Sequence, residues 1–196
     1  MRVNKIHMQR IAAFLFLIAI ICTSAFAQTL SAELDKIKQI KLLESTREDV
    51  ERILSGYKGK HYAVGLSQTF SSKKIEIEVS YTRGDCPDGV DKWNIEKGKV
   101  DFIDISFNDP VKFEDLKYNA SDFRKERMPV DKEDAFVYHD KNKGIVFLVE
   151  KEKLTSIFLM PSRSQSSLLC NSEESKKLKE FYSRESYFEI PARLQK

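Results

Sequence analysis

Hydrophobic residues spaced three and four positions apart predict two short helices near the start of the chain, over residues 31–40 and 45–56. The apolar positions are Leu34, Ile37, Val50, Ile53 and Leu54. Ser45 and Glu48 fit a capping box at the start of the second helix, and Gly56 stands where a left-handed C-terminal cap is expected. This part of the chain is therefore expected to form a pair of amphipathic helices.

After Gly56 the period becomes twofold, which is typical of strands with one buried and one solvated face in an antiparallel sheet. Residues 75–81 show it most clearly, because apolar side chains alternate there with Glu and Ser. Further strands are expected at residues 60–66, 93–95, 100–107, 135–139, 145–149 and 154–160. Gly98 and Gly144 stand in turns between neighbouring strands.

The strands at 145–149 and 154–160 are apolar on both faces, which places them in the centre of a sheet. Residues 113–127 lack twofold alternation and predict one or two short helical turns. Helices followed by a meander of strands indicate an α+β domain over residues 28–170, with an N-terminal helical pair packed on an antiparallel β-sheet.

Residues 171–196 shift in composition toward Ser, Glu, Lys and aromatic residues and predict a C-terminal helix and tail. Oppositely charged residues recur there four positions apart, and Leu178, Phe181 and Tyr182 form a narrow apolar stripe. Two interpretations are open. The segment is either a surface helix docked loosely on the domain or a helix that binds a partner protein.

Residues 1–27 have the pattern of a secretory signal peptide. Lys5 and Arg10 precede an apolar run at residues 11–21, and Ala25-Phe26-Ala27 has the small-residue spacing of a signal-peptidase site. We expect cleavage after Ala27, which makes the mature protein secreted or periplasmic.

Two other fates of this leader are open. A transmembrane anchor is one, but the run at residues 11–21 is shorter than the roughly 20 residues that a spanning helix needs. Acylation of Cys22 is the other, and it is disfavoured because Ile21 stands where a lipoprotein peptidase prefers a small residue. No later run is long and apolar enough to be a transmembrane segment.

The composition of the 196 residues, 41% apolar and 32% charged, is that of one ordinary globular domain and excludes collagen-like and wholly disordered classes. Arg2, Lys5 and Arg10 lie in the leader, and removing them from the 33 basic residues leaves 30, equal to the number of acidic residues. A mature chain without net charge is not drawn to phosphate backbones. Nucleic acid is therefore not an expected partner.

The mature chain keeps two cysteines, Cys86 and Cys170, which permit one intramolecular pairing. In an oxidising compartment a disulfide is their expected fate, with two buried free thiols as the alternative. The bridge would close a loop of 84 residues, which corresponds to about 4–5 kcal/mol in the chain-entropy model. Trp93 is expected to pack against this disulfide.

No catalytic residue or cofactor is assigned, because the common hydrolase and nucleotide-binding motifs are absent from the sequence. Asp85, Asp88 and Asp91 crowd one turn, but their spacing does not match a calcium-binding EF-hand loop. His61 and His139 have no neighbouring ligand at zinc-site spacing. A catalytic site assembled from distant residues stays open.

Residues 41–56 combine a small-residue turn, a helix with Val50 and Leu54 and a terminal glycine, and they resemble the opening of the BamE (SmpA/OmlA) and β-lactamase-inhibitor-like (BLIP-like) fold. Further stretches are similar to a group of uncharacterised secreted bacterial proteins, namely residues 81–86, residues 93–95 with Gly98 and Val100, Tyr138 with Gly144, and residues 161–170. The resemblance implies a two-helix layer on an antiparallel sheet and binding to other proteins of the cell envelope. It implies no catalytic residues.

These patterns together predict an exported α+β domain that binds another envelope or extracellular protein through a sheet face, its loops or the C-terminal helix. A hydrolase with a site that no local motif announces is the alternative. Exposed apolar surface favours the binding protein, whereas a cleft with convergent ionisable groups favours the enzyme.

Overall fold

The structure is a computed structural model that describes residues 30–61, 66–84, 86, 92–116, 118–129 and 134–187. The expected signal peptide, including Cys22, lies outside the described residues, and so does the turn that carries Asp85, Asp88 and Asp91. Among the described residues, no helix is long and apolar enough to cross a membrane.

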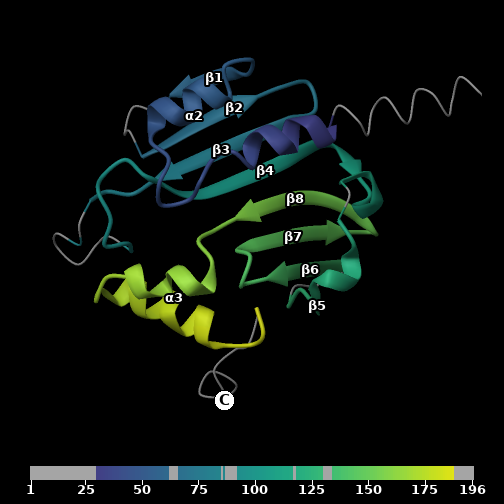
Figure 1. The fold of residues 1–196 in the computed structure, drawn as a ribbon. Helices are drawn as coiled ribbons and strands as arrows, with labels where there is room; N and C mark the ends of the chain where they lie inside the picture. Colours follow the sequence, from purple (N-terminus) through teal and green to yellow (C-terminus); the bar gives the residue numbers. More distant parts are fainter. Residues whose placement is uncertain are drawn as a thin grey trace, which may run out of the picture.

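Eight antiparallel strands form one sheet in the order β1-β2-β3-β4-β8-β7-β6-β5 (Figure 1). The strands are β1 (Lys58–His61), β2 (Ser67–Ser71), β3 (Ile75–Tyr81), β4 (Val100–Val111), β5 (Arg124–Arg127), β6 (Ala135–Asp140), β7 (Ile145–Glu150) and β8 (Lys153–Leu159). Strands β1 to β4 form one meander and β5 to β8 another, and the pairing of β4 with β8 joins their last strands. The antiparallel sheet and the mixed α+β class are confirmed.

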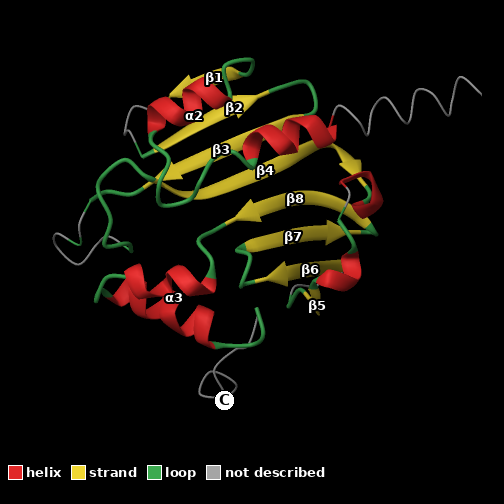
Figure 2. Cartoon of the chain, in the orientation of Figure 1, coloured by secondary structure: helices red, strands yellow, loops and turns green. Residues whose placement is uncertain are grey.

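Helical segments are spread along the chain (Figure 2). Residues 30–37 are helical, and the other segments are α2 (Arg47–Ile53), the 3-10 helices η1 (Phe113–Leu116), η2 (Ala120–Asp122) and η3 (Arg163–Leu168), and α3 (Glu173–Ser183). The helices are therefore not confined to the predicted N-terminal pair, since η1, η2, η3 and α3 follow β4. The turns expected within 113–127 are present as η1 and η2.

One face of the sheet carries the main core. Across its centre, Ile77, Ile105, Ile157 and Phe147 lie in register, and each side chain is at most 2% exposed. The helical segment 30–37 and α2 lie over this face of the first meander (Figure 1). They add to the same core cluster the buried side chains of Leu30, Leu34, Ile37, Val50 and Leu54.

The cap of α2 differs from the prediction by one residue. Thr46 is the N-cap, its side chain accepts from the amide of Asp49, and the Asp49 carboxylate accepts from the Thr46 amide. Ser45 is not the cap, because its Oγ accepts from the amide of Lys41 and closes the preceding turn. Gly56 is not a left-handed cap either, since the C-cap is Leu54 with φ −95°.

The predicted hairpin of residues 93–95 with 100–107 is wrong. Trp93 forms an isolated bridge with Leu169, while β4 pairs with β3 and β8. Gly98 and Gly144 do adopt the positive φ expected of turn glycines, 83° and 68°.

Two strands at the edge of the sheet also differ from the sequence prediction. β1 begins at Lys58, two residues before the strand predicted over 60–66, and residues 62–65 of that prediction lie outside the described residues. The four-residue β5 was not predicted at all, since its sequence Arg-Lys-Glu-Arg has no apolar alternation. Charged residues on an edge strand oppose pairing with another chain, which agrees with the place of β5 at the end of the sheet.

A second hydrophobic cluster fixes η3 and α3 to the domain. It consists of Leu43, Trp93, Leu169 and Tyr182, with Leu178 and Phe181 packed against it. The Sγ atoms of Cys86 and Cys170 are 2.10 Å apart, the distance of a disulfide bond, which links the chain near Trp93 to the end of η3.

Candidate functional site

The face of the sheet opposite the core carries polar and acidic residues at its centre. Glu76 and Glu78 of β3 are exposed, and Asp104 of β4 lies directly opposite Glu78 in the pairing register. Phe102 of β4 and Phe158 of β8 lie on the same face, and Asp104 pairs with Phe158. We call these five residues, Glu76, Glu78, Phe102, Asp104 and Phe158, the acidic face.

Three carboxylates lie together on the acidic face. None of Glu76, Glu78 and Asp104 forms an ion pair with another described residue, although like charges directly opposite each other on paired strands are destabilising. Burial, followed by the negative charge of Glu78, raises the pKa of Asp104 to about 6, and only the hydroxyl of Ser106 opposes this. One oxygen of Asp104 is buried and has no hydrogen-bond partner among the described residues.

Two aromatic rings lie beside these carboxylates. The rings of Phe102 and Phe158 are stacked, with centroids 5.9 Å apart and planes 19° apart, and both side chains are half-buried. An apolar pair next to carboxylates that have no ion pair among the described residues offers both contact area and charge to a second molecule.

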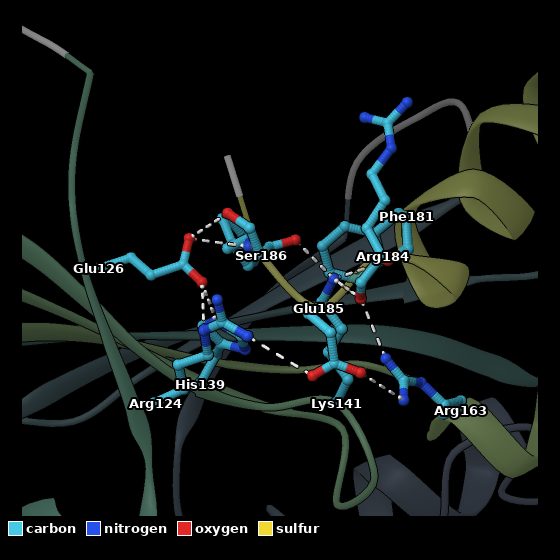
Figure 3. Close-up of polar contacts among 10 residues, drawn as sticks. Arg124, Glu126, His139, Lys141, Arg163, Phe181, Arg184, Glu185 and Ser186 are labelled. Atoms are coloured by element: carbon cyan, nitrogen blue, oxygen red, sulfur yellow. Dashed lines mark hydrogen bonds and ion pairs between the residues drawn. The ribbon is translucent and has the colours of Figure 1, made fainter. Parts of the chain in front are cut away.

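At the β5–β6 end the same face of the sheet is covered by residues 184–187, which follow α3. Lys141, after β6, is 5% exposed, and its ammonium donates to the carbonyls of Phe181, Arg184 and Ser186 at 2.6, 3.0 and 2.9 Å (Figure 3). A cation at the carbonyl end of a helix is favourable, and here it fixes the segment that follows α3. Burial, followed by the charge of Arg163, lowers the pKa of Lys141.

Glu126 of β5 is the second anchor of this segment. One carboxylate oxygen accepts from Nε2 of His139 at 2.9 Å and from Nε of Arg124 at 3.1 Å. The other accepts from the hydroxyl of Ser186 at 2.6 Å and from the amide of Tyr187 at 2.8 Å. Since an ionised carboxylate only accepts hydrogen bonds, Nε2 of His139 is the donor in this contact.

This arrangement does not provide a nucleophile for hydrolysis. A serine in a catalytic triad gives its hydroxyl proton to the histidine, whereas Ser186 donates to the carboxylate of Glu126. Among the described residues, Nδ1 of the buried His139 has no hydrogen-bond partner. The residues around Glu126 therefore hold residues 184–187 in place.

The residues predicted for partner binding on the C-terminal helix face the protein itself. Tyr182 is 3% exposed and donates its hydroxyl proton to the carbonyl of Pro161, while Leu178 and Phe181 pack half-buried against the second cluster. Tyr182 therefore belongs to the fold and is not available to a partner. The stripe reflects how α3 docks on its own domain.

Other candidates from the sequence can be placed as follows. Trp93 is 2% exposed in the second cluster beside Leu169, the residue before Cys170. His61 is the last residue of β1, and His139 forms a hydrogen bond with Glu126. No group of three or more His, Cys, Asp or Glu side chains in the part of the chain that the structure describes could hold a metal ion.

A cavity of about 640 Å³ lies on the core side, near η1 and the β5–β7 end of the sheet. Phe113, Phe136 and Tyr138 line it, and the ammonium of Lys125, another lining residue, lies 3.9 Å from the centre of the Phe136 ring. The chain thus places its own cation on this aromatic surface.

Sequence reasoning missed the acidic face. The alternation in residues 75–81 shows that Glu76 and Glu78 face solvent, but nothing local shows that Asp104 lies opposite Glu78 or that β8 adds Phe158. Comparison with protein-family models, with curated proteins and with solved structures found no match.

Proposed function

We propose that this protein is an extracytoplasmic binding domain, and that it binds a basic surface of another protein across the acidic face of its sheet. The observation that carries the proposal is the direct opposition of Glu78 and Asp104, neither of which forms an ion pair with another described residue. A fold selected for stability alone gains by replacing one of them, because two like charges directly opposite each other on paired strands cost free energy.

The chemistry of the surface indicates the class of partner. Lysine or arginine side chains of a partner would neutralise Glu76, Glu78 and Asp104, and the cost of their repulsion would be recovered on binding. The stacked rings of Phe102 and Phe158 supply the apolar area that interface centres are rich in. A basic surface with an apolar centre fits both features.

The compartment is part of the proposal. The disulfide-distance pair of Cys86 and Cys170 supports an oxidising environment, and the expected leader at residues 1–27 supports export. The resemblance to BamE and β-lactamase-inhibitor-like proteins stays a prediction. Binding to envelope proteins, which it implies, is the same class of function.

The proposal is tested with a defined basic probe. A synthetic peptide that alternates lysine and leucine is titrated into isotopically labelled protein, and amide shifts are followed by NMR. We expect saturable shifts in β3, β4 and β8, and at least a tenfold weaker affinity in the Glu78→Gln, Asp104→Asn double variant.

The control variant, Glu173→Gln with Glu180→Gln, removes two exposed carboxylates from α3 and keeps the same net charge as the test variant. It should bind the peptide as the wild type does, and a matched peptide of glutamate and leucine should not bind. Equal weakening in both double variants would reduce the effect to net charge and would overturn the proposal.

A further inference from the structure

Two guanidinium groups from distant parts of the chain converge on one point. Arg124 begins β5 and Arg163 begins η3, and both line a cavity of about 280 Å³ together with Lys141 and Glu185. The carboxylate of Glu185 lies between them, 3.5 Å from Nη1 of Arg124 and 3.9 Å from Nη1 of Arg163 (Figure 3).

Both guanidiniums are oriented by other contacts. Nε of Arg124 is held at 3.1 Å by Glu126, which is 13% exposed, and Nη2 of Arg163 donates to the carbonyl of Arg184 at 3.0 Å. In both groups Nη1 lies toward the same carboxylate, that of Glu185. A planar fork of donors with fixed orientation matches the oxygens of a carboxylate or a phosphate.

Glu185, which lies between the two guanidinium groups, makes only weak contacts with them. Charge-assisted hydrogen bonds are typically about 2.7–2.9 Å long, and both contacts of Glu185 are longer. Its side chain is 80% exposed, and ion pairs at such exposure contribute little to stability. An external anion could replace this carboxylate at small cost.

The other charged residues that line the cavity do not oppose the binding of an anion. The ammonium of Lys141 adds a third positive group to the lining. The carboxylate of Asp140 is already compensated, because Lys143 lies 3.1 Å away and the amides of Asn142 and Lys143 donate to it. Asp122 is exposed to solvent.

We propose that the cavity between Arg124 and Arg163 binds a small oxyanion, a carboxylate or a phosphate, and that Glu185 is its intramolecular competitor. This site lies at the β5–β6 end of the sheet and does not depend on binding at the acidic face. Its ligand has the opposite charge to the partner proposed for that face.

The test is an NMR titration at constant ionic strength, with inorganic phosphate and succinate as separate probes and sodium chloride as the reference. We expect saturable amide shifts around Arg163 and Glu185 with at least one probe, and the stronger of the two identifies the class of anion. In Glu185→Gln the affinity should rise about threefold to fivefold, the gain that follows from removing a competing exposed ion pair.

Glu180→Gln is the matched control, because Glu180 is also an exposed glutamate near the end of α3 and pairs with Arg184. Its affinity should equal that of the wild type. Arg163→Gln should abolish saturable binding, and Arg163→Lys, which keeps the charge but loses the planar fork, should weaken it.

Three results would overturn the site: no saturation in either the wild type or Glu185→Gln, equal tightening in Glu180→Gln, or unchanged binding in a folded Arg163→Gln. If the Arg163 variants do not fold, the comparison of Glu185→Gln with Glu180→Gln decides alone, since both residues are exposed. Peptide binding at the acidic face should be unaffected by Glu185→Gln, so the two proposals fail separately.

Discussion

Replacing Asp104 with asparagine is expected to stabilise the protein at neutral pH and to weaken its binding to a basic partner. Asp104 is half-buried opposite Glu78, and burial together with that charge raises its pKa from an ordinary value of 3.8 to about 6. Asparagine has nearly the same shape and removes the charge. The protein thus keeps at this position a residue that costs stability.

The magnitude follows from the pKa. The difference between 3.8 and about 6 corresponds to about 3 kcal/mol, at about 1.36 kcal/mol per pKa unit. Because the carboxyl is partly exposed, solvent screening reduces the expected gain in the free energy of unfolding to about 1–2 kcal/mol.

The sign is fixed by proton linkage. The folded state has the higher pKa, so between pH 3.8 and about 6 it binds more protons at Asp104 than the unfolded state does. The contribution of Asp104 to stability is therefore lost as the pH rises through this window. The advantage of Asp104→Asn should be near zero below pH 4 and should reach its full value above pH 6.

The assay is urea unfolding of wild type and Asp104→Asn at a series of pH values from 3.5 to 7.5, with intrinsic fluorescence as the probe. Asp109→Asn, which changes an exposed aspartate of the same strand, is the control and should show no comparable gain. A variant that is less stable than wild type at pH 7.5, or whose advantage does not depend on pH, would refute the reasoning about the acidic face.

Four further substitutions test the fold by denaturant unfolding. Gly144→Ala should cost at least about 2 kcal/mol, because φ is 68° and a Cβ there would overlap a backbone carbonyl, whereas Gly98→Ala, with φ 83° and open space, should cost about 1 kcal/mol. Cys170→Ser should lower stability by about 4–5 kcal/mol, and mass spectrometry of the oxidised wild type should show no free thiol at Cys86 or Cys170; two free thiols would contradict the bridge. Tyr182→Phe should cost about 1–2 kcal/mol, since it leaves a buried carbonyl unpaired, and it should not change peptide binding. A normal melt for Tyr182→Phe would mean that α3 is not docked as described.

Local signals in the sequence predicted much of the sheet. The alternation in residues 75–81 gave β3 with its buried face, because a half-buried strand needs no distant information to be recognised. The helix around Val50 was also correct, but its cap moved from Ser45 to Thr46, since Ser45 closes the preceding turn instead. Which of the two side chains caps the helix depends on which neighbouring backbone amide is left without a hydrogen bond.

Contacts between distant segments of the chain could not be predicted from the sequence. Trp93 pairs with Leu169 across 76 positions, and only the position of η3 and the cysteine pair makes that contact possible. The acidic face needs three strands in one register, and the partner of Glu78 lies beyond a long connection. The stripe on α3 was visible, but an apolar stripe does not show whether its own domain covers it.

Site-specific photo-crosslinking in the cells that produce the protein shows whether a partner binds at the acidic face. A photoreactive phenylalanine analogue is placed at Phe158 on the acidic face or at Phe181 on α3, two half-buried phenylalanines. We expect an adduct from Phe158 with a basic protein, lost when Glu78→Gln and Asp104→Asn are added, and none from Phe181. An adduct from Phe181 with none from Phe158 would contradict it.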